Sequence, residues 1–532
     1  MRTSLTLSLV ALVAPCALAQ SNSVPGLDGN LYRVDSLTYY GHEGSFPNGR
    51  TGMAMLNEMC NPGTVNIPWY APMQPNHPKF GFMICRESNG RFEQISDRSF
   101  VKHAFLSTNY SGPCGSCQNP GTGALMGVHC ADTYGAGNNA DQYYLGPADE
   151  IDPWLGTWNP VGSYFDRGDP DVGPPQNRDG NRSLTRSQTT AFGPVKNRVI
   201  VQDADLNVPG ATYYYCIHLV HEGEPVANRG NNLASRRFVP TWNGSQWNFS
   251  NAGSQVQGTW LQWWTGATYS LGGNGQDDGR FAVAVKVTGP SNGLWHYEYA
   301  VHNIDNSRGG ASFRLPICGA ARVFQTGFKD IDSDPLNQWT VSRAGGELVF
   351  TAPPSNPLDW NELFNFWFDS DAAPVPGTVH LDEARLGPGA LDVAVASQVP
   401  MNVPNVWLGA GCGTPSSELR GLGIASSPNP SFALQLDGAP NTFTLLFYSW
   451  NNVTLPLPGG CTQYLDPSMI GTFATGMTNG SGRIQWPLPI PAGLGAGAID
   501  FQAAQIQNGG PLFSLFTLSN GLMVRFGITG CP

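Results

Sequence analysis

One stretch of the sequence, RFAVAVKVTGPSNGLWHYEYAV at residues 280–301, decides the fold. Its two ends are rich in β-branched and aromatic residues, and the Gly-Pro-Ser-Asn-Gly segment between them is typical of a turn. In its second half aromatic residues alternate with polar ones: Trp295, Tyr297 and Tyr299 against His296 and Glu298. Because successive side chains of a strand point to opposite faces, we expect the aromatic ones to share one face.

Strand-like runs of the same kind recur along the chain, at residues 197–202 (NRVIVQ), 211–220 (ATYYYCIHLV) and 347–351 (ELVFT). Gly and Pro account for 65 and 43 of the 532 residues, and charged residues for only 13%. Long stretches of strong helix formers are missing. A hydrophobic content of 41% and 15 Trp supply enough core to exclude a disordered chain. The composition therefore predicts an all-β protein of short strands and long loops.

Changes in composition divide the chain into parts. Residues 20–396 form an N-terminal part, which we interpret as one or two β-sandwich-like modules with a possible subdivision near residue 190. Residues 397–406 contain two Pro and three Val and indicate a linker. Residues 407–532 are poor in charge and rich in turn residues, which predicts a C-terminal β-sandwich that acts as an accessory module.

The start of the chain has the features of a signal peptide. Arg2 precedes an apolar run at residues 5–13, and Ala-Leu-Ala then gives a cleavage pattern that ends at Ala19. Pro15 stands directly before Cys16, which argues against a lipoprotein signal. Since no later run of about 18 apolar residues follows, we expect a secreted or cell-surface protein without a transmembrane anchor.

Ten cysteines follow the expected cleavage site: Cys60, Cys85, Cys114, Cys117, Cys130, Cys216, Cys318, Cys412, Cys461 and Cys531. An even number in an exported chain predicts up to five disulfides. Seven of them precede residue 400 and three follow it. Either each part keeps one odd cysteine, or one bridge crosses between the parts. Within the C-terminal part we expect Cys412 to pair with Cys461.

The segment Cys114-Gly-Ser-Cys117 allows three interpretations. Together with His129 and Cys130, its thiolates could bind zinc. Alone, the two cysteines could form a redox centre, which requires a strand and a helix on either side. The flanking residues are instead Pro- and Gly-rich, as in a loop. Structural disulfides that involve Cys114, Cys117 and Cys130 are therefore the favoured interpretation.

Several segments resemble a group of uncharacterised secreted, Gly/Pro-rich β proteins of planctomycete-type bacteria. The resemblance covers about half of the chain and is carried by residues 228–236 (NRGNNLASR), 295–303 (WHYEYAVHN), 363–374 (LFNFWFDSDAAP), 409–412 (GAGC), 455–458 (LPLP) and 518–524 (LSNGLMV). The last three resemble the low-charge C-terminal module of that group. The resemblance implies export, β-structure and two parts, and it brings no catalytic residues with it.

Two sets of side chains are candidate metal ligands. Copper or zinc is bound by neutral imidazoles, and the candidates for such a site are His103, His129, His218 and His221. Calcium is bound by carboxylates, and Asp330, Asp332 and Asp334 alternate as in a calcium loop. The EF-hand pattern fails, because Pro335 stands where Gly is needed and Val341 where Glu is needed. Solvated turns and hydrogen-bonded core histidines are the alternatives.

Tryptophans cluster between residues 242 and 264, and Trp260 and Trp264 have the same strand parity. Flat aromatic side chains can stack on sugar rings, so these two residues are candidates for a glycan-binding platform. Large aromatic residues also fill the cores of β-sandwiches, which is the alternative. Extracellular polysaccharide or the cell envelope would be the partner of such a platform.

Charge and motifs limit the possible functions. A net charge of −11 and the lack of a Lys/Arg run argue against a nucleic-acid partner. The sequence contains no GxSxG, HExxH or P-loop motif. The leading hypothesis is an extracellular or cell-surface binding or structural protein, with glycan as a candidate ligand. The rival hypothesis is a secreted copper- or zinc-dependent enzyme with a histidine-built site in the N-terminal part.

Overall fold

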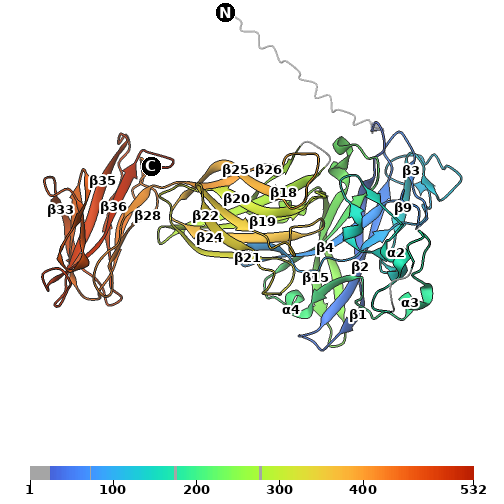
Figure 1. Ribbon diagram of the computed structural model, residues 1–532, viewed down its shortest axis with the longest axis horizontal. Coiled ribbons are helices and arrows are strands. Elements are labelled where there is room, and N and C mark those ends of the chain that lie inside the picture. The colour runs from blue at the N-terminus through green and yellow to red at the C-terminus, as the bar shows by residue number, and fades with distance from the viewer. Residues whose placement is uncertain (1–23, 72, 173–176, 275–277) are drawn as a thin grey trace, which may run out of the picture.

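The computed structural model describes residues 24–71, 73–172, 177–274 and 278–532, and shows three β-rich parts that follow one another along the long axis (Figure 1). The predicted all-β fold is confirmed, since antiparallel strands dominate and the α-helices have only four or five residues. None of the helices in these ranges is long and apolar enough to cross a membrane. The predicted signal peptide, residues 1–19, lies outside the described residues.

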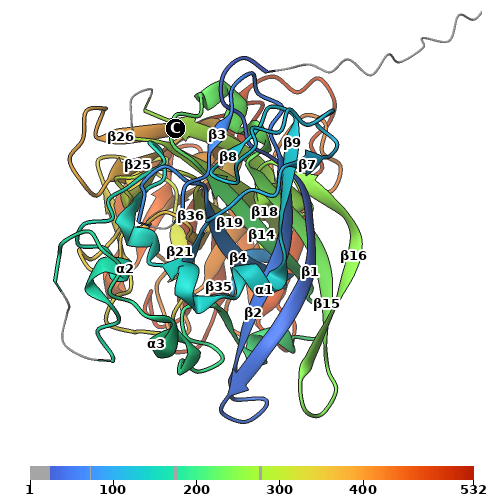
Figure 2. The ribbon, with the colours of Figure 1, turned by 90° about the vertical axis from the view of Figure 1, so that its right-hand side faces the viewer.

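The first part contains two sheets. The first sheet consists, in order, of β1 (Asn30–Glu43), β2 (Arg50–Cys60), β9 (Cys130–Tyr134) and β7 (Tyr110–Ser111), with β13 (Val199–Gln202) also paired to β2. The second consists of β10 (Leu145–Gly146), β6 (Val101–His103), β4 (Lys79–Ser88), β14 (Thr212–Val220), β15 (Leu233–Trp242) and β16 (Trp247–Gln257), with β5 (Arg91–Gln94) also paired to β4. In Figure 2 β1, β2 and β9 lie in front of β4 and β14.

Strand β4 (KFGFMICRES) is buried on both faces, which explains its nearly continuous apolar sequence. Phe80, Phe82 and Ile84 point into the core between the two sheets of the first part. Met83 and Cys85, on the opposite face, belong to a second core shared with residues of the middle part. Since a strand alternates its side chains between its two faces, β4 joins the two cores.

Short elements connect these strands. They are β3 (Ile67–Pro68), β8 (Leu125–Met126), β11 (Ile151–Asp152), β12 (Thr157–Trp158), α1 (Ala136–Asn139), α2 (Tyr164–Arg167), α3 (Arg186–Thr190), α4 (Asp203–Leu206), η1 (Gln142–Tyr144), η2 (Ala148–Glu150) and η3 (Val226–Asn231). The possible subdivision near residue 190 is wrong, because strands that follow this position pair with strands that precede it. β13 pairs with β2, and β14 pairs with β4. The first part extends to the end of β16.

The middle part is a pair of five-stranded sheets preceded by η4 (Trp260–Trp263). One sheet has the order β17 (Thr268–Gly273), β18 (Arg280–Ser291), β19 (Leu294–Asn303), β24 (Leu363–Ser370) and β21 (Val323–Lys329). The other has the order β22 (Thr340–Ala344), β23 (Glu347–Thr351), β20 (Gly310–Pro316), β25 (Ala373–Glu383) and β26 (Asp392–Asn402). The predicted alternation in β19 is confirmed, since Trp295, Tyr297 and Tyr299 enter the core between these sheets.

The C-terminal part is a sandwich of two further sheets. The larger has the order β27 (Asn405–Leu408), β36 (Phe516–Phe526), β35 (Gly497–Ile506), β30 (Phe443–Ser449) and β33 (Gly471–Met477). The smaller has the order β28 (Glu418–Leu422), β29 (Ala433–Asp437) and β34 (Arg483–Pro487), while β31 (Asn452–Pro456), η5 (Pro458–Gly460) and β32 (Thr462–Leu465) form a separate hairpin. Leu434, Leu446 and Phe501 belong to the apolar core of this part.

The predicted linker at residues 397–406 is wrong for most of its length. Strand β26 continues to Asn402 and pairs with β25 along its whole length, so that only Val403 and Pro404 separate β26 from β27. Pro400 is tolerated because β26 is the edge strand of its sheet.

One disulfide joins the middle part to the end of the chain. Cys318 follows β20, and Cys531 follows β36; the two are 213 residues apart in sequence. The sequence left open whether a bridge crosses between the parts, and this one does. It fixes the end of the C-terminal sandwich to the middle part at a position where Cys318 itself is buried in the core.

Candidate functional site

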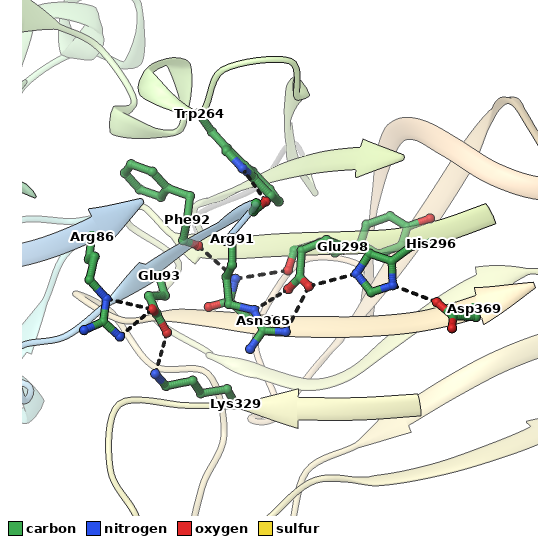
Figure 3. Close-up of polar contacts among 12 residues, drawn as sticks. Arg86, Arg91, Phe92, Glu93, Trp264, His296, Glu298, Lys329, Asn365 and Asp369 are labelled. Atoms are coloured by element: carbon green, nitrogen blue, oxygen red, sulfur yellow. Dashed lines mark hydrogen bonds and ion pairs between the residues drawn. The ribbon is translucent and has the colours of Figure 1, made fainter. Parts of the chain in front are cut away.

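The junction between the first and middle parts is built around the hairpin of β4 and β5 (Figure 3). Arg91, the first residue of β5, donates hydrogen bonds from Nε and Nη2 to the two carboxylate oxygens of Glu298 on β19, at 2.7 and 2.9 Å. The Arg91 guanidinium carbon also lies 3.8 Å from the ring centroid of Trp367. Bidentate ion pairs of this kind are among the strong side-chain interactions. The pair fixes the hairpin to the sheet that contains β19, on the face opposite Tyr297 and Tyr299.

His296 extends this ion pair along β19. Its Nδ1 lies 2.7 Å from a carboxylate oxygen of Asp369 on the neighbouring strand β24, and its Nε2 lies 3.3 Å from Glu298. Hydrogen bonding to Glu298, and then to Asp369, raises the pKa of His296 above its usual value of 6.5. The folded protein therefore binds this proton more tightly than the unfolded chain does, because the imidazole lies between two carboxylates.

A second set of contacts holds the other side of the hairpin. The Glu93 carboxylate accepts hydrogen bonds from the Arg86 guanidinium at 2.7 and 3.0 Å and from the Lys329 ammonium of β21. Burial raises the pKa of Glu93, but these two cations outweigh it and hold the pKa below the usual range. The backbone of the hairpin is also bound, since Asn365 Nδ2 of β24 donates a hydrogen bond to the Phe92 carbonyl at 2.9 Å. The hairpin thus contacts three strands of the middle part.

A cleft of about 430 Å³ opens at the same junction. Four charged side chains line it, namely Arg98, Asp149, Asp359 and Arg385. Arg98 forms an ion pair with Asp149 and donates from Nε to the Trp360 carbonyl at 2.8 Å, while Arg385 Nη2 lies 2.6 Å from Asp359. The first part supplies Arg98 and Asp149, and the middle part supplies Asp359 and Arg385, so the cleft exists only when the two parts are joined.

Glu362 lies behind these charged residues. Its Oε2 accepts a hydrogen bond from the Asp359 backbone N–H at 2.7 Å, and its Oε1 lies 3.8 Å from Arg98 Nε. Burial raises the pKa of Glu362 to about 8, although Arg98 acts in the opposite direction. At neutral pH the carboxyl group is therefore mostly protonated. The cleft is thus lined by guanidinium and carboxylate groups that are paired with one another, with a buried carboxyl group behind them.

The four histidines predicted to bind copper or zinc do not form one site. His103 Nδ1 lies 2.8 Å from His77 Nε2, His218 Nδ1 accepts from Trp360 Nε1 at 3.1 Å, and His221 Nε2 lies 3.3 Å from Glu224. His129 instead lies against Gly115 in the cysteine-rich loop. Among the described residues, no three His, Cys, Asp or Glu side chains are grouped so that they could hold a metal ion. The histidine-built site is therefore wrong.

Burial explains the state of these histidines. It lowers the pKa of His103 well below 6.5 and that of His218 to about 3, so both imidazoles are neutral inside the protein. They are hydrogen-bonded core residues, which was the alternative to the metal hypothesis. The rival enzyme hypothesis loses its proposed ligands.

The calcium loop at Asp330, Asp332 and Asp334 is also wrong. The Asp332 backbone N–H donates to the Asp330 carboxylate at 3.2 Å, and the Asp334 backbone N–H donates to that of Asp332 at 2.7 Å. Asn356 Nδ2 donates to the remaining oxygen of Asp330 at 2.7 Å. The carboxylates therefore stabilise successive turns of the chain, and no grouping of metal ligands is found in the described part of this loop.

The tryptophans predicted to bind glycan are buried. Trp260 and Trp264 expose 1% and 2% of their surface and belong to the core shared by β4, β14 and the middle part. Trp264 Nε1 donates to the Gly90 carbonyl at the tip of the β4–β5 hairpin at 3.0 Å. Both residues fill the junction, so the exposed platform is wrong and the core interpretation holds.

The disulfides settle the cysteine alternatives. Cys412 is joined to Cys461, as predicted. Cys114 is joined to Cys60 and Cys117 to Cys130, so the zinc and redox interpretations of the CxxC segment are wrong and the structural one is correct. In the described part of the chain Cys85 and Cys216 remain buried thiols. They lie on neighbouring strands but are not opposite each other, since Cys85 faces Tyr214 and Cys216 faces Met83.

The residues of the junction were not identified as a site from the sequence. Arg91, Arg98 and Glu362 stand at isolated positions without a motif, and their partners are more than 50 residues away. One signal was present: Glu298 was assigned to the face of its strand opposite the aromatic residues. A charged residue in the middle of a buried strand requires a partner, and Arg91 is that partner.

Comparisons with known proteins identify no family. No family model and no curated protein matches the chain. BcpA, the major pilin subunit of Bacillus cereus, is 12% identical over 65% of this chain and 88% of its own, with a TM-score of 0.18. Escherichia coli alpha-2-macroglobulin activated by porcine elastase is 7% identical over 94% of this chain and 35% of its own, with a TM-score of 0.13. Similarities this low carry no argument about function.

The pKa of His296 predicts a pH dependence of stability. Because the folded-state pKa is raised, the protonated imidazole stabilises the protein fully below about pH 6.5, and this contribution is lost as the pH rises through the folded-state pKa. We expect His296→Gln to lower the melting temperature more at pH 5.5 than at pH 9, as measured by calorimetry. A melting-temperature difference that stays the same at both pH values would contradict the proposed role of His296.

Proposed function

We propose that this chain is an exported structural protein of the cell surface or extracellular space, in which the first and middle parts form one rigid unit. The observation that carries the proposal is the β4–β5 hairpin, which is bound by polar and charged residues on three strands of the middle part. Flexibly linked modules would share few contacts, whereas here one strand, β4, contributes to the cores on both sides.

The energetics of the junction support this rigidity. Glu298 exposes only 5% of its side chain. Removing Arg91 would leave its carboxylate buried and without its main cationic partner, at a cost of about 3 kcal/mol. Glu93 is buried to the same extent between Arg86 and Lys329. Separation of the two parts would break the ion pairs Arg91–Glu298 and Lys329–Glu93. It would also expose Trp260 and Trp264, which lie in the shared core.

Disulfides support the location. Four bridges occur in the described residues. One joins Cys60 to Cys114, which are 54 residues apart, and another joins Cys318 in the middle part to Cys531. Disulfides form and persist in oxidising compartments, and are rare in the cytosol. Together with the signal-peptide pattern at residues 1–19, they favour export.

Coupling between the parts can be measured by calorimetry. The first and middle parts of the wild-type chain should unfold in one transition, and Arg91→Ala should split this transition or lower its midpoint, because about 3 kcal/mol of junction energy is lost. Arg33→Ala is the matched control, since Arg33 pairs with Asp35 and Glu58 inside the first part and is half exposed. Independent unfolding of the two parts in the wild type would overturn the rigid-unit proposal.

Export can be tested on producing cells. We expect the protein in the medium or accessible to protease added to intact cells, with Gln20 as its first residue in mass spectrometry. Protein that stays inside the cell and retains Met1 would exclude the extracellular role.

The junction cleft favours ligand binding as a second candidate function. Its guanidinium and carboxylate groups suit a neutral glycan, and a glycan array with uncharged polysaccharides tests this directly. Arg385→Ala should weaken any binding at least tenfold, whereas Arg33→Ala, which does not line the cleft, should leave it unchanged. Failure of the wild type to bind any glycan, or equal binding by Arg385→Ala, would rule out this cleft as a glycan site.

A further inference from the structure

Strand β33 is a free edge at the end of the molecule remote from the first part (Figure 1). In the described chain it pairs with β30 and with no other strand, because it is the last strand of its sheet. It carries one irregularity, between the pairs Leu446–Ala474 and Phe447–Thr472. Beyond it, residues 474–477 continue in regular register. A regular edge of this kind presents unpaired backbone N–H and C=O groups to the surroundings.

Apart from this irregularity, the edge has neither of two common protections against strand pairing, a charged residue or a proline. Residues 471–477 (GTFATGM) contain no charge and no Pro. Three other edge strands differ: β22 carries Arg343, β34 carries Arg483 and ends in Pro487, and β26 contains Pro400. Edge strand β16 is covered, because Gln255 and Gln257 hydrogen-bond the backbone of β1. Natural edges are normally kept apart by such charges, prolines or covers.

An exposed apolar row borders the edge. Met477 pairs with Phe443 on β30, and the pair Thr444–Gln505 places Ile506 of β35 next to Phe443. These three side chains expose 61%, 41% and 39% of their surface, respectively. Met477 lies on the edge strand itself, so a further strand added there would cover it, while Phe443 and Ile506 continue the row across the sheet.

We propose that β33 is an interface at which two copies of this chain pair, edge to edge and antiparallel. A two-fold axis brings the same edge from both copies together, so that the N–H groups of each face the C=O groups of the other. The apolar rows of the two copies then meet beside the new ladder. This inference extends the structural role proposed above, but it depends on different residues.

Charge favours a second copy as the occupant of this edge. The whole chain has a net charge of −11, so two copies repel each other over most of their surface. Residues 407–532 contain four acidic and three basic residues. Arg420 and Arg483 both pair with Asp437 on the smaller sheet. The C-terminal part is therefore nearly neutral, and two copies meet the least repulsion there.

The test is the concentration dependence of the molecular mass of the full chain without residues 1–19, measured by light scattering. We expect the wild-type mass to double as the concentration rises. Thr472→Lys/Thr475→Lys, which adds charges at two exposed positions of β33, should weaken the association at least tenfold. Thr340→Lys/Ser342→Lys on edge strand β22 adds the same charge at exposed positions and should associate like the wild type.

Hydrogen–deuterium exchange of the wild type provides a second measurement that needs no variant. Amides of β33 should exchange more slowly at high than at low concentration, while those of β22 should not change. A wild type that stays monomeric at all concentrations, a β33 variant that still dimerises, or association that requires an added glycan would each overturn the inference. Such a result leaves the rigid-unit proposal intact, since that depends on coupled unfolding of the first and middle parts.

Discussion

The ion pair between Arg91 and Glu298 is the interaction on which the arrangement of the chain depends. It joins the tip of a hairpin in the first part to the centre of a sheet in the middle part, and Trp367 and His296 lie next to it. Since β4 is one strand of this hairpin, the ion pair also fixes β4, which contributes side chains to both cores. The junction cleft follows from the same constraint, because its charged lining comes from both parts.

The chain uses its few charges mainly where elements distant in sequence meet. Lys329 reaches Glu93 across 236 residues, and Arg98 reaches the Trp360 carbonyl across 262. Arginine suits this role, because its planar fork makes several directed hydrogen bonds at once. A low content of charged residues is thus compatible with a polar junction, as long as each buried charge has a partner.

Local features of the sequence predicted local features of the structure. The alternation around Tyr297 has a period of two, which is a property of one strand, and it placed each side chain on the correct face. Cys412 and Cys461 were predicted to pair because both lie in one compact part. The all-β fold followed in the same way from composition and short strand-like runs.

Features that depend on distant pairing were not predictable. The subdivision near residue 190 failed because β14 pairs with β4, which precedes it by more than 120 residues. Trp260 and Trp264 looked like a platform because the sequence shows that a side chain is aromatic, but not what covers it. His103 and His218 failed as ligands for the same reason, since each found its partner, His77 or Trp360, elsewhere in the fold.

The bridge between Cys318 and Cys531 has a mechanical consequence. A pulling force applied at or beyond residue 531 passes through this covalent bond directly into the core of the middle part. The 212 residues between the two cysteines, which include the whole C-terminal sandwich, are then excluded from the load path. The sandwich would stay folded under tension that unfolds the strands before Cys318, and its free edge would stay available while those earlier strands are stretched.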